Sequence, residues 1–258
     1  MLPSLFIAHG APTLAIESND YTTFLAELAD HYPKPKAIVI FSAHFETPVQ
    51  AVGRVEAYET IHDFYGFPEE MYRLRYPAKG DLALADRVKA LLDDQQIPTQ
   101  LNEQRGLDHG AWVILRLLYP AADVPVISMS VNPFLTPEEQ YRIGKALSAL
   151  RREDILIIGS GGTVHNLRQI NWNASQPDAW AVAFDDWLID RLQKWDTAEL
   201  FDYETKAPHA RQAVPRNEHF VPLFYAMGAA DDSPSAQLLY RSYQFGSLSL
   251  TCWQFGKE

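Results

Sequence analysis

The chain has 258 residues, of which 47% are hydrophobic, and it carries a net charge of −11. A chain of this length and composition can bury a substantial core. The acidic balance argues against nucleic acid or an anionic membrane as a partner, because either one requires a basic surface. The single cysteine, Cys252, excludes an internal disulfide and fits a reducing compartment, so we expect a cytoplasmic protein.

Short apolar runs alternate with longer amphipathic segments along the chain, which is typical of βαβ units. Strands are expected at Ser4–Ala8, Ala37–Phe41, Val124–Met129, Ile155–Ile158 and Gly246–Gln254. Helices are expected at Tyr21–His31, Asp81–Asp94, Gly110–Leu118, Pro137–Arg151, Asp178–Gln193 and Asn217–Met227. The first run has no basic stretch before it, so we interpret it as a strand and not as a signal peptide.

No repeat and no Gly- or Ser-rich linker divides the chain. No apolar run approaches the roughly 20 residues that a membrane span needs. The sequence therefore predicts one α/β domain over residues 1–258, with helices flanking a largely parallel central sheet.

One long segment, Tyr58–Pro77, is rich in proline and aromatic residues and follows neither a helical nor a strand periodicity. A segment of this length without regular structure is usually functional in a compact domain. We therefore expect it to form one wall of a substrate pocket, with His62 and Tyr65 facing the ring of the substrate. Simple packing of the aromatic rings on one another is the alternative interpretation.

Four of the 8 histidines occur where a predicted strand ends or a predicted helix begins. His9 and His44 follow the first two strands, and His165 follows the strand at Ile155–Ile158. His219 lies in the first turn of the last helix, where the helix N-terminus favours a neutral imidazole. Because ligands gather beyond the carboxyl ends of parallel strands, these imidazoles are expected to converge. Neutral imidazoles suit Zn, Fe, Cu or Ni, so the pattern predicts a metal site.

Each histidine considered alone also fits a role in a turn or a cap. Asn217 is a candidate cap for the helix of His219. The glycines of Gly159–Gly162 match neither a phosphate-binding motif nor a hydrolase nucleophile motif, and are expected to let the backbone pass close to a buried centre. His165 is a candidate general base. His109 precedes a helix, where a ring fixed toward a site and a capping role are equally compatible with the sequence.

Assembled in chain order, these segments resemble the class III extradiol ring-cleavage dioxygenases, in the branch similar to DOPA 4,5-dioxygenase. The matching segments are His9-Gly-Ala-Pro12, Ser42-Ala-His-Phe45, Ile61-His-Asp-Phe-Tyr-Gly-Phe-Pro68, Asp108-His-Gly-Ala-Trp112, Val164-His-Asn-Leu167, Glu218-His219 and Gly246-Ser-Leu-Ser249. They span almost the whole chain in the order of the family. The resemblance implies an α/β fold around one non-haem metal ion.

The resemblance also implies roles for individual histidines. The positions that match the metal ligands of the family are His9, His44 and His219. His165 matches the acid/base histidine and is a candidate fourth ligand of a resting zinc ion, whereas His109 matches a histidine that contacts the substrate. The wider superfamily binds Fe(II) through two histidines and one carboxylate, and His219 takes the carboxylate position here, as in this branch. The resemblance implies Fe(2+) as the metal for catalysis. Because a site of three histidines also suits Zn(2+) well, Zn(2+) is a plausible bound metal.

The implied reaction opens the ring of a catechol such as DOPA with O₂, so the expected partners are a small aromatic diol and O₂. His165 would remove a phenolic proton, and His109 would stabilise the developing oxyanion. A zinc hydrolase is one alternative, in which the same imidazoles lower the pKa of bound water to about 7. A non-catalytic binding module, like the related Memo family, is the other, although a binding surface has no need of five site histidines.

Overall fold

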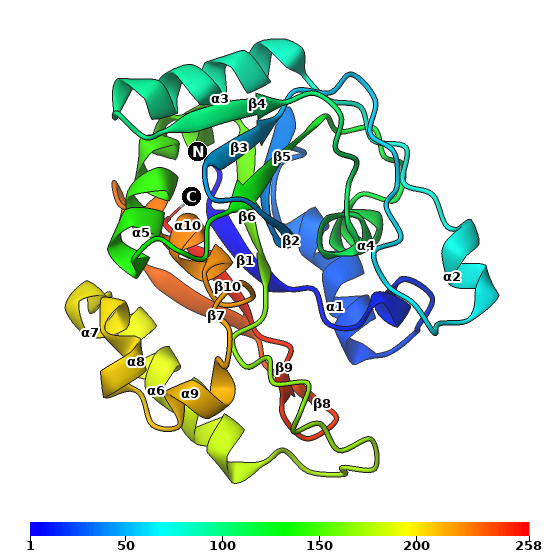
Figure 1. Cartoon of the computed structure of the whole chain (residues 1–258), viewed down its shortest axis with the longest axis vertical. Coiled ribbons are helices and arrows are strands. Elements are labelled where there is room, and N and C mark those ends of the chain that lie inside the picture. Colours follow the sequence, from blue (N-terminus) through cyan, green and yellow to red (C-terminus); the bar gives the residue numbers. More distant parts are fainter. Residues whose placement is uncertain (258) are drawn as a thin grey trace.

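An eight-stranded sheet runs through the molecule, with helices on both of its faces (Figure 1). This computed structural model describes residues 1–257, so Glu258 lies outside the described residues. The order of the strands across the sheet is β4-β3-β5-β2-β6-β1-β10-β7. Their bounds are β1 Ser4–Ala8, β2 Ala37–Glu46, β3 Gln50–Gly53, β4 Thr99–Asn102, β5 Val126–Val131, β6 Ile155–Gly161, β7 Ala236–Tyr240 and β10 Cys252–Phe255. A separate hairpin joins β8 (Tyr243–Gln244) to β9 (Leu248–Ser249).

The centre of the sheet is parallel, whereas antiparallel pairs occur toward its edges. β6 lies between β1 and β2 and pairs in parallel with both, and β2 also pairs in parallel with β5. β10 is antiparallel to β1 and to β7, and β3 is antiparallel to β5. The predicted largely parallel α/β sheet is therefore confirmed. As a consequence, the carboxyl ends of β1, β2 and β6 lie at one edge of the sheet.

The central strands are buried on both faces, which explains why they are continuously apolar. Along β2, Ile38 and Ile40 join the core beneath the helices α1 and α4, whereas Val39 and Phe41 join the core beneath α3, α5 and α10. The bounds of the helices are α1 Asp20–Leu28, α2 Glu69–Arg73, α3 Leu82–Asp94, α4 His109–Leu118, α5 Pro137–Ala146, α6 Ala179–Gln193, α7 Thr197–Phe201, α8 Tyr203–Lys206, α9 Ala210–Ala213 and α10 Pro222–Gly228. Figure 1 shows α5 and α10 on the opposite side of the sheet from α1 and α4.

The start of the last helix differs from the prediction. α10 begins at Pro222, and Asn217 does not cap it, because the side-chain amide of Asn217 donates to the carbonyl of Pro133. Proline is favoured at the first position of a helix because it has no N–H to leave unpaired. His219 therefore lies in the turn before α10, where the main-chain carbonyl of Asn217 accepts from Phe220 and Val221.

The predicted strand Gly246–Gln254 is wrong in its first half. Gly246 has a φ of 82° and turns the chain between β8 and β9, and only the segment from Cys252 onward joins the large sheet. The strands β3, β4 and β7 were not predicted; β4 and β7 are half-exposed, and none of the three exceeds five residues. Such short segments carry little periodicity.

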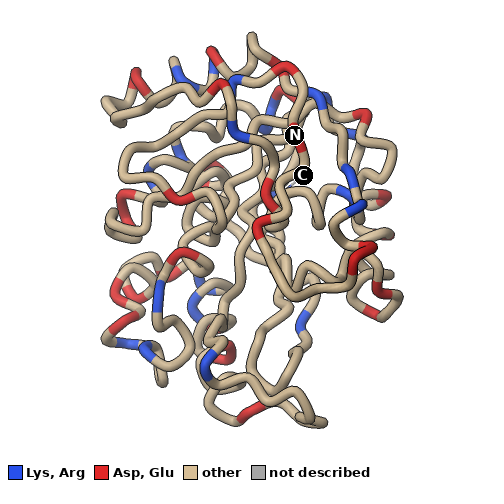
Figure 2. Tube along the Cα trace, turned by 45° about the vertical axis from the view of Figure 1, so that its right-hand side comes forward, with Lys and Arg blue, Asp and Glu red and all other residues tan. Residues whose placement is uncertain are grey.

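Acidic and basic residues are interspersed along the trace in the view of Figure 2. Within residues 1–257, no helix combines the length and the apolar character that crossing a bilayer requires.

Candidate metal centre

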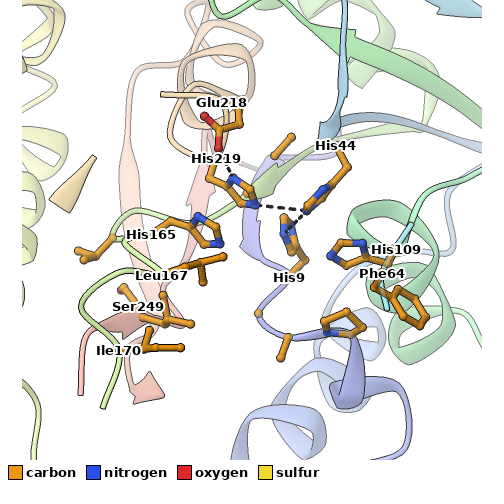
Figure 3. Close-up of a pocket in the computed structure, with 18 of the residues that line it drawn as sticks. His9, His44, Phe64, His109, His165, Leu167, Ile170, Glu218, His219 and Ser249 are labelled. Carbon is orange, nitrogen blue, oxygen red and sulfur yellow. Dashed lines mark hydrogen bonds and ion pairs between the residues drawn. The ribbon is translucent and has the colours of Figure 1, made fainter. Parts of the chain in front are cut away.

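Three imidazoles from distant parts of the chain meet at the carboxyl edge of the sheet (Figure 3). His9 directly follows β1, His44 lies near the end of β2, and His219 comes from the turn before α10. The Nε2 atom of His44 is 3.1 Å from Nε2 of His9 and 3.2 Å from Nε2 of His219. Two nitrogens that bind one metal at about 2.0–2.1 Å stand roughly 3.0–3.4 Å apart. The spacing of these nitrogens therefore fits a shared metal ion.

Glycine allows the segment of His219 to pack directly against the end of β6. A Cβ on Gly161 would lie 2.1 Å from the carbonyl oxygen of His219, and the N–H of Gly162 donates to that oxygen at 2.8 Å. Gly110 at the start of α4 has a similar role, because a Cβ there would lie 2.9 Å from Cδ2 of His44. At Gly161 the structure agrees with the expectation for Gly159–Gly162, because the backbone of His219 passes close to that glycine.

Hydrogen bonds fix which nitrogen of the imidazoles carries the hydrogen. The hydroxyl of Ser160 donates to the carbonyl of Gly110 at 2.5 Å, so its oxygen must accept from Nδ1 of His9 at 3.1 Å. Similarly, Nδ1 of His219 donates to a carboxylate oxygen of Glu218 at 3.0 Å. The Nε2 lone pairs of His9 and His219 are therefore free, and hydrogen bonds of this kind orient metal-binding histidines. Both lone pairs are directed toward Nε2 of His44, so the donor set fits a metal ion.

Burial keeps these imidazoles neutral, as metal ligands must be. Burial, reinforced by His44, lowers the pKa of His9 well below its ordinary value. Burial and the neighbouring His165 do the same to the pKa of His219. For His44, burial and the nearby His109 lower the pKa to about 3.

His165 stands beside this set, with its ring parallel to that of His219. Its ring stacks on the ring of His219, with centroids 3.5 Å apart and planes 8° apart. An imidazole binds a metal through a lone pair that lies in the plane of its ring. Because the two rings are stacked and parallel, a metal in the plane of the His219 ring would lie out of the plane of the His165 ring by about the distance between the rings. Donor atoms of His165, Glu218 and His219 are close enough to form a second candidate set. We favour the first set, because the stacking argues against His165 as the fourth ligand.

His109 opens α4 and also reaches the centre. His9, His44 and His109 also lie close enough to share an ion, so His109 stands beside the metal site. Its Nδ1 is 3.0 Å from a carboxylate oxygen of Asp63, and its ring lies next to that of His44, with centroids 3.9 Å apart.

A cavity of about 670 Å³ opens in front of the histidines. Apolar side chains line it from two sides; they are Phe64 and Phe67 from the segment before α2, and Leu167, Ile170, Trp172, Phe245 and Leu248 from the opposite side. Arg216, Glu46 and Glu218 supply charge to its wall. Arg216 pairs with Glu46 at 2.7 Å and lies 3.4 Å from Glu218.

Two residues, His62 and Tyr65, were predicted to face the substrate, and only Tyr65 lines the cavity. Tyr65 lines the mouth of the cavity and is 92% exposed. His62 is not among the residues that line the cavity. Its Nε2 hydrogen-bonds to the carbonyl of Leu74, and its ring packs near Phe64 and Trp112.

Sequence reasoning missed the residues that orient the histidines. Glu218 directly precedes its partner His219, whereas Asp63 follows His62 and Ser160 lies between Gly159 and Gly161. A polar residue next to a candidate ligand was therefore a signal for Glu218 alone. Which nitrogen each one would contact depends on the fold.

The fold and the site define an α/β metalloprotein, with a three-histidine metal site at the carboxyl edge of a parallel sheet and an apolar cavity in front of it. The family described as the catalytic LigB subunit of aromatic ring-opening dioxygenase matches residues 4–252. The chain belongs to this family of class III extradiol dioxygenases and is a metal-dependent extradiol ring-cleavage enzyme.

Curated relatives match nearly the whole chain. It is 41% identical over 256 residues to a 4,5-DOPA dioxygenase extradiol of Beta vulgaris, covering 98% of this chain and 96% of that protein. It is 36% identical over 259 residues to the protein of the same name from Escherichia coli K12, covering 99% and 95%. A crystal structure of an uncharacterized protein from Escherichia coli K12 superposes with a TM-score of 0.83 at 32% identity, covering 99% of this chain and all 100% of that one. These matches favour the dioxygenase over the hydrolase and the binding module.

Proposed function

We propose that the protein opens the ring of a DOPA-like catechol with O₂, with Fe(II) held by His9, His44 and His219. The observation that carries this proposal is the convergence of three neutral imidazoles on the wall of an apolar cavity. The names of the curated relatives support the substrate class. We assign the activity to one catalytic domain formed by residues 1–258 and place it in the cytoplasm, in keeping with the single Cys252.

The choice of Fe(II) as the catalytic metal follows from the chemistry of O₂. Zn²⁺ has no redox chemistry, although it fits three imidazoles and is proposed as an alternative, inactive occupant. When bound, Fe(II) supplies open positions for the catechol oxygens and the electrons that O₂ requires.

His165 is proposed as the group that moves the substrate proton. Burial, with a contribution from His109, lowers the pKa of His165 to about 4, so the ring is neutral near pH 7 and has a lone pair to accept a phenolic proton. Its place against His219 puts it beside the metal ligands and on the cavity wall. The proton taken from the catechol hydroxyl stays on this ring nitrogen and returns to an oxygen of the opened product.

The charged groups on the cavity wall support an amino-acid side chain on the catechol. Glu46 follows His44 by two residues on β2, and both line the cavity, so they are about 6–7 Å apart along the strand. Glu46 can accept from an ammonium group, and its partner Arg216 can donate to a carboxylate. Tyr65 at the mouth is proposed to contact the substrate, and His62 to support it through Phe64.

The proposal is tested by loading metal-free protein with Fe(II) under anaerobic conditions and then adding L-DOPA and air. We expect a yellow ring-opened product from the iron form and none from a parallel sample loaded with Zn²⁺. Tyrosine is the matched control substrate, because one hydroxyl cannot chelate the metal. Equal turnover by the zinc form, or none by a fully iron-loaded protein, would contradict the proposal.

A further inference from the structure

The segment Tyr58–Pro77 sends one carboxylate, that of Asp63, in among the histidines. One oxygen of Asp63 accepts from the main-chain N–H of His109 at 2.9 Å and lies 3.0 Å from Nδ1 of the same residue. The other oxygen lies 3.6 Å from Nδ1 of His44. The side chain is 23% exposed. Asp63 thus contacts two imidazoles of the centre.

The contacts of Asp63 determine the tautomer of its partner. The oxygen that lies 3.0 Å from Nδ1 of His109 also accepts from the main-chain N–H of that residue at 2.9 Å. That oxygen therefore faces the ring as an acceptor, so Nδ1 of His109 is the atom that carries the hydrogen. In the neutral imidazole this leaves the lone pair on Nε2.

The orientation of the His109 ring is fixed from several sides. Asp108 caps α4 through the N–H of Ala111, which holds the first turn of the helix in place. The ring of Phe64 packs edge-on against the ring of His109, with centroids 5.8 Å apart. With Nδ1 held by Asp63, the opposite edge of the ring lies on the cavity wall beside His9 and His44 (Figure 3).

We propose that Asp63 is a positioning residue that holds His109 in its Nδ1–H form, so that Nε2 accepts a hydrogen bond from a hydroxyl of the substrate. This inference deepens the proposed catechol reaction and rests on it. It also changes the expected role of His109, because the neutral ring in this form cannot donate from Nε2 to an oxyanion. The hydrogen bond would instead orient the catechol through one of its own hydroxyls.

The first test reads the tautomer directly and needs no turnover. Nitrogen-15 spectra of the histidine rings are recorded on the zinc-loaded protein, with His109 assigned by its loss in His109→Ala. We expect His109 to carry its hydrogen on Nδ1, and Asp63→Ala to lose this single form. A hydrogen on Nε2 in the parent, or an unchanged tautomer in Asp63→Ala, would overturn the proposal even if the enzyme opens catechols.

The second test asks whether Asp63 acts through His109. In the iron form, Asp63→Ala should lower kcat about 10- to 100-fold, the usual effect of losing such an orienting group, with metal content retained. The same substitution in a His109→Ala background should cause no further loss, and Asp63→Glu should recover part of the activity. Glu70→Ala, an exposed acid of the same segment, is the control and should match the parent.

A loss of kcat that only follows loss of metal would show that Asp63 acts on His44 instead, and would overturn the proposal. Full additivity of the two substitutions would overturn it as well. If Asp63→Ala does not fold, Asp63→Asn preserves the shape of the side chain and removes its charge. Asp63→Asn should then also lower kcat. An unchanged kcat together with an unchanged ring tautomer in Asp63→Asn would contradict the proposed role of the carboxylate.

Discussion

The imidazole of His165 lies flat against that of His219, with ring centroids 3.5 Å apart and an interplanar angle of 8°. Stacking puts His165 next to the proposed ligand His219 and directs its own lone pairs into a parallel plane. The proposed roles of the two histidines, metal binding for His219 and proton transfer for His165, can therefore be separated by substitution.

Replacement of His165 tests this separation. His165→Ala in the iron-loaded protein should lower kcat by roughly 10²-fold or more, the scale expected for loss of a positioned acid or base. Metal content, measured by elemental analysis after dialysis, should stay at the level of the parent. Loss of metal from this variant would show that His165 is a ligand after all.

Replacement of His44, in contrast, should reduce metal binding. Its Nε2 is the one that contacts both of the other proposed ligands, so His44→Ala should weaken metal binding by more than about 100-fold, beyond the usual cost of losing an orienting partner. The circular dichroism spectrum should be unchanged, because the ring is part of the cavity wall. His31→Ala, at an exposed histidine, is the matched control, and equal metal binding by both variants would refute the ligand assignment.

The pH dependence of stability follows from the lowered pKa values. Burial lowers the pKa of His44 from 6.5 to about 3, and burial lowers that of His165 from 6.5 to about 4. Below pH 6.5 the unfolded chain binds more protons than the folded one, so stability is complete above that pH and declines as the pH falls toward 4 and then 3. Each histidine contributes at most about 1.4 kcal/mol per pH unit.

Urea unfolding of the metal-free protein between pH 7.5 and 4.5 would measure this decline. The double variant His44→Ala, His165→Ala should show a shallower slope over the same range. An identical slope in the parent and the double variant would show that other groups dominate the acid sensitivity.

The charged groups of the cavity wall give a prediction about selectivity. Arg216→Gln should raise KM for L-DOPA about 5-fold, because an exposed charge pair is worth up to about 1 kcal/mol. KM for 4-methylcatechol, which lacks the amino-acid group, should not change. Arg168→Gln is the control, since Arg168 is outside the set of residues that line the cavity. Parallel changes for both substrates would place the amino-acid group elsewhere.

The central strands and the convergence of the histidines were predictable because they depend on long apolar runs and on one topological rule. His9 and His44 come from strands that are parallel to β6, which lies between them, so their carboxyl ends must meet. The start of α5 also has a local cause, because the side chains of Thr136 and Glu139 form a capping box there. These features are encoded locally or by the sheet itself.

The remaining features depend on contacts that no local pattern records. His62 and Asp63 are neighbours in a segment without periodicity, and only the fold decides that the acid turns toward His109 while His62 turns toward Trp112. The sequence also could not show that His165 would stack on His219. Pairing of β8 with β9 likewise follows from a turn at Gly246 that interrupts an apparently continuous strand.

The most direct test of the account is the stoichiometry and product mass of the reaction of the iron form with L-DOPA. We predict that one O₂ is consumed for each catechol and that the product has the mass of the catechol plus both oxygen atoms, as ring opening requires. A product that has lost two hydrogens and gained no oxygen would be a quinone. That result, or no oxygen uptake by protein with a full complement of iron, would contradict the assignment of the three-histidine centre to ring cleavage.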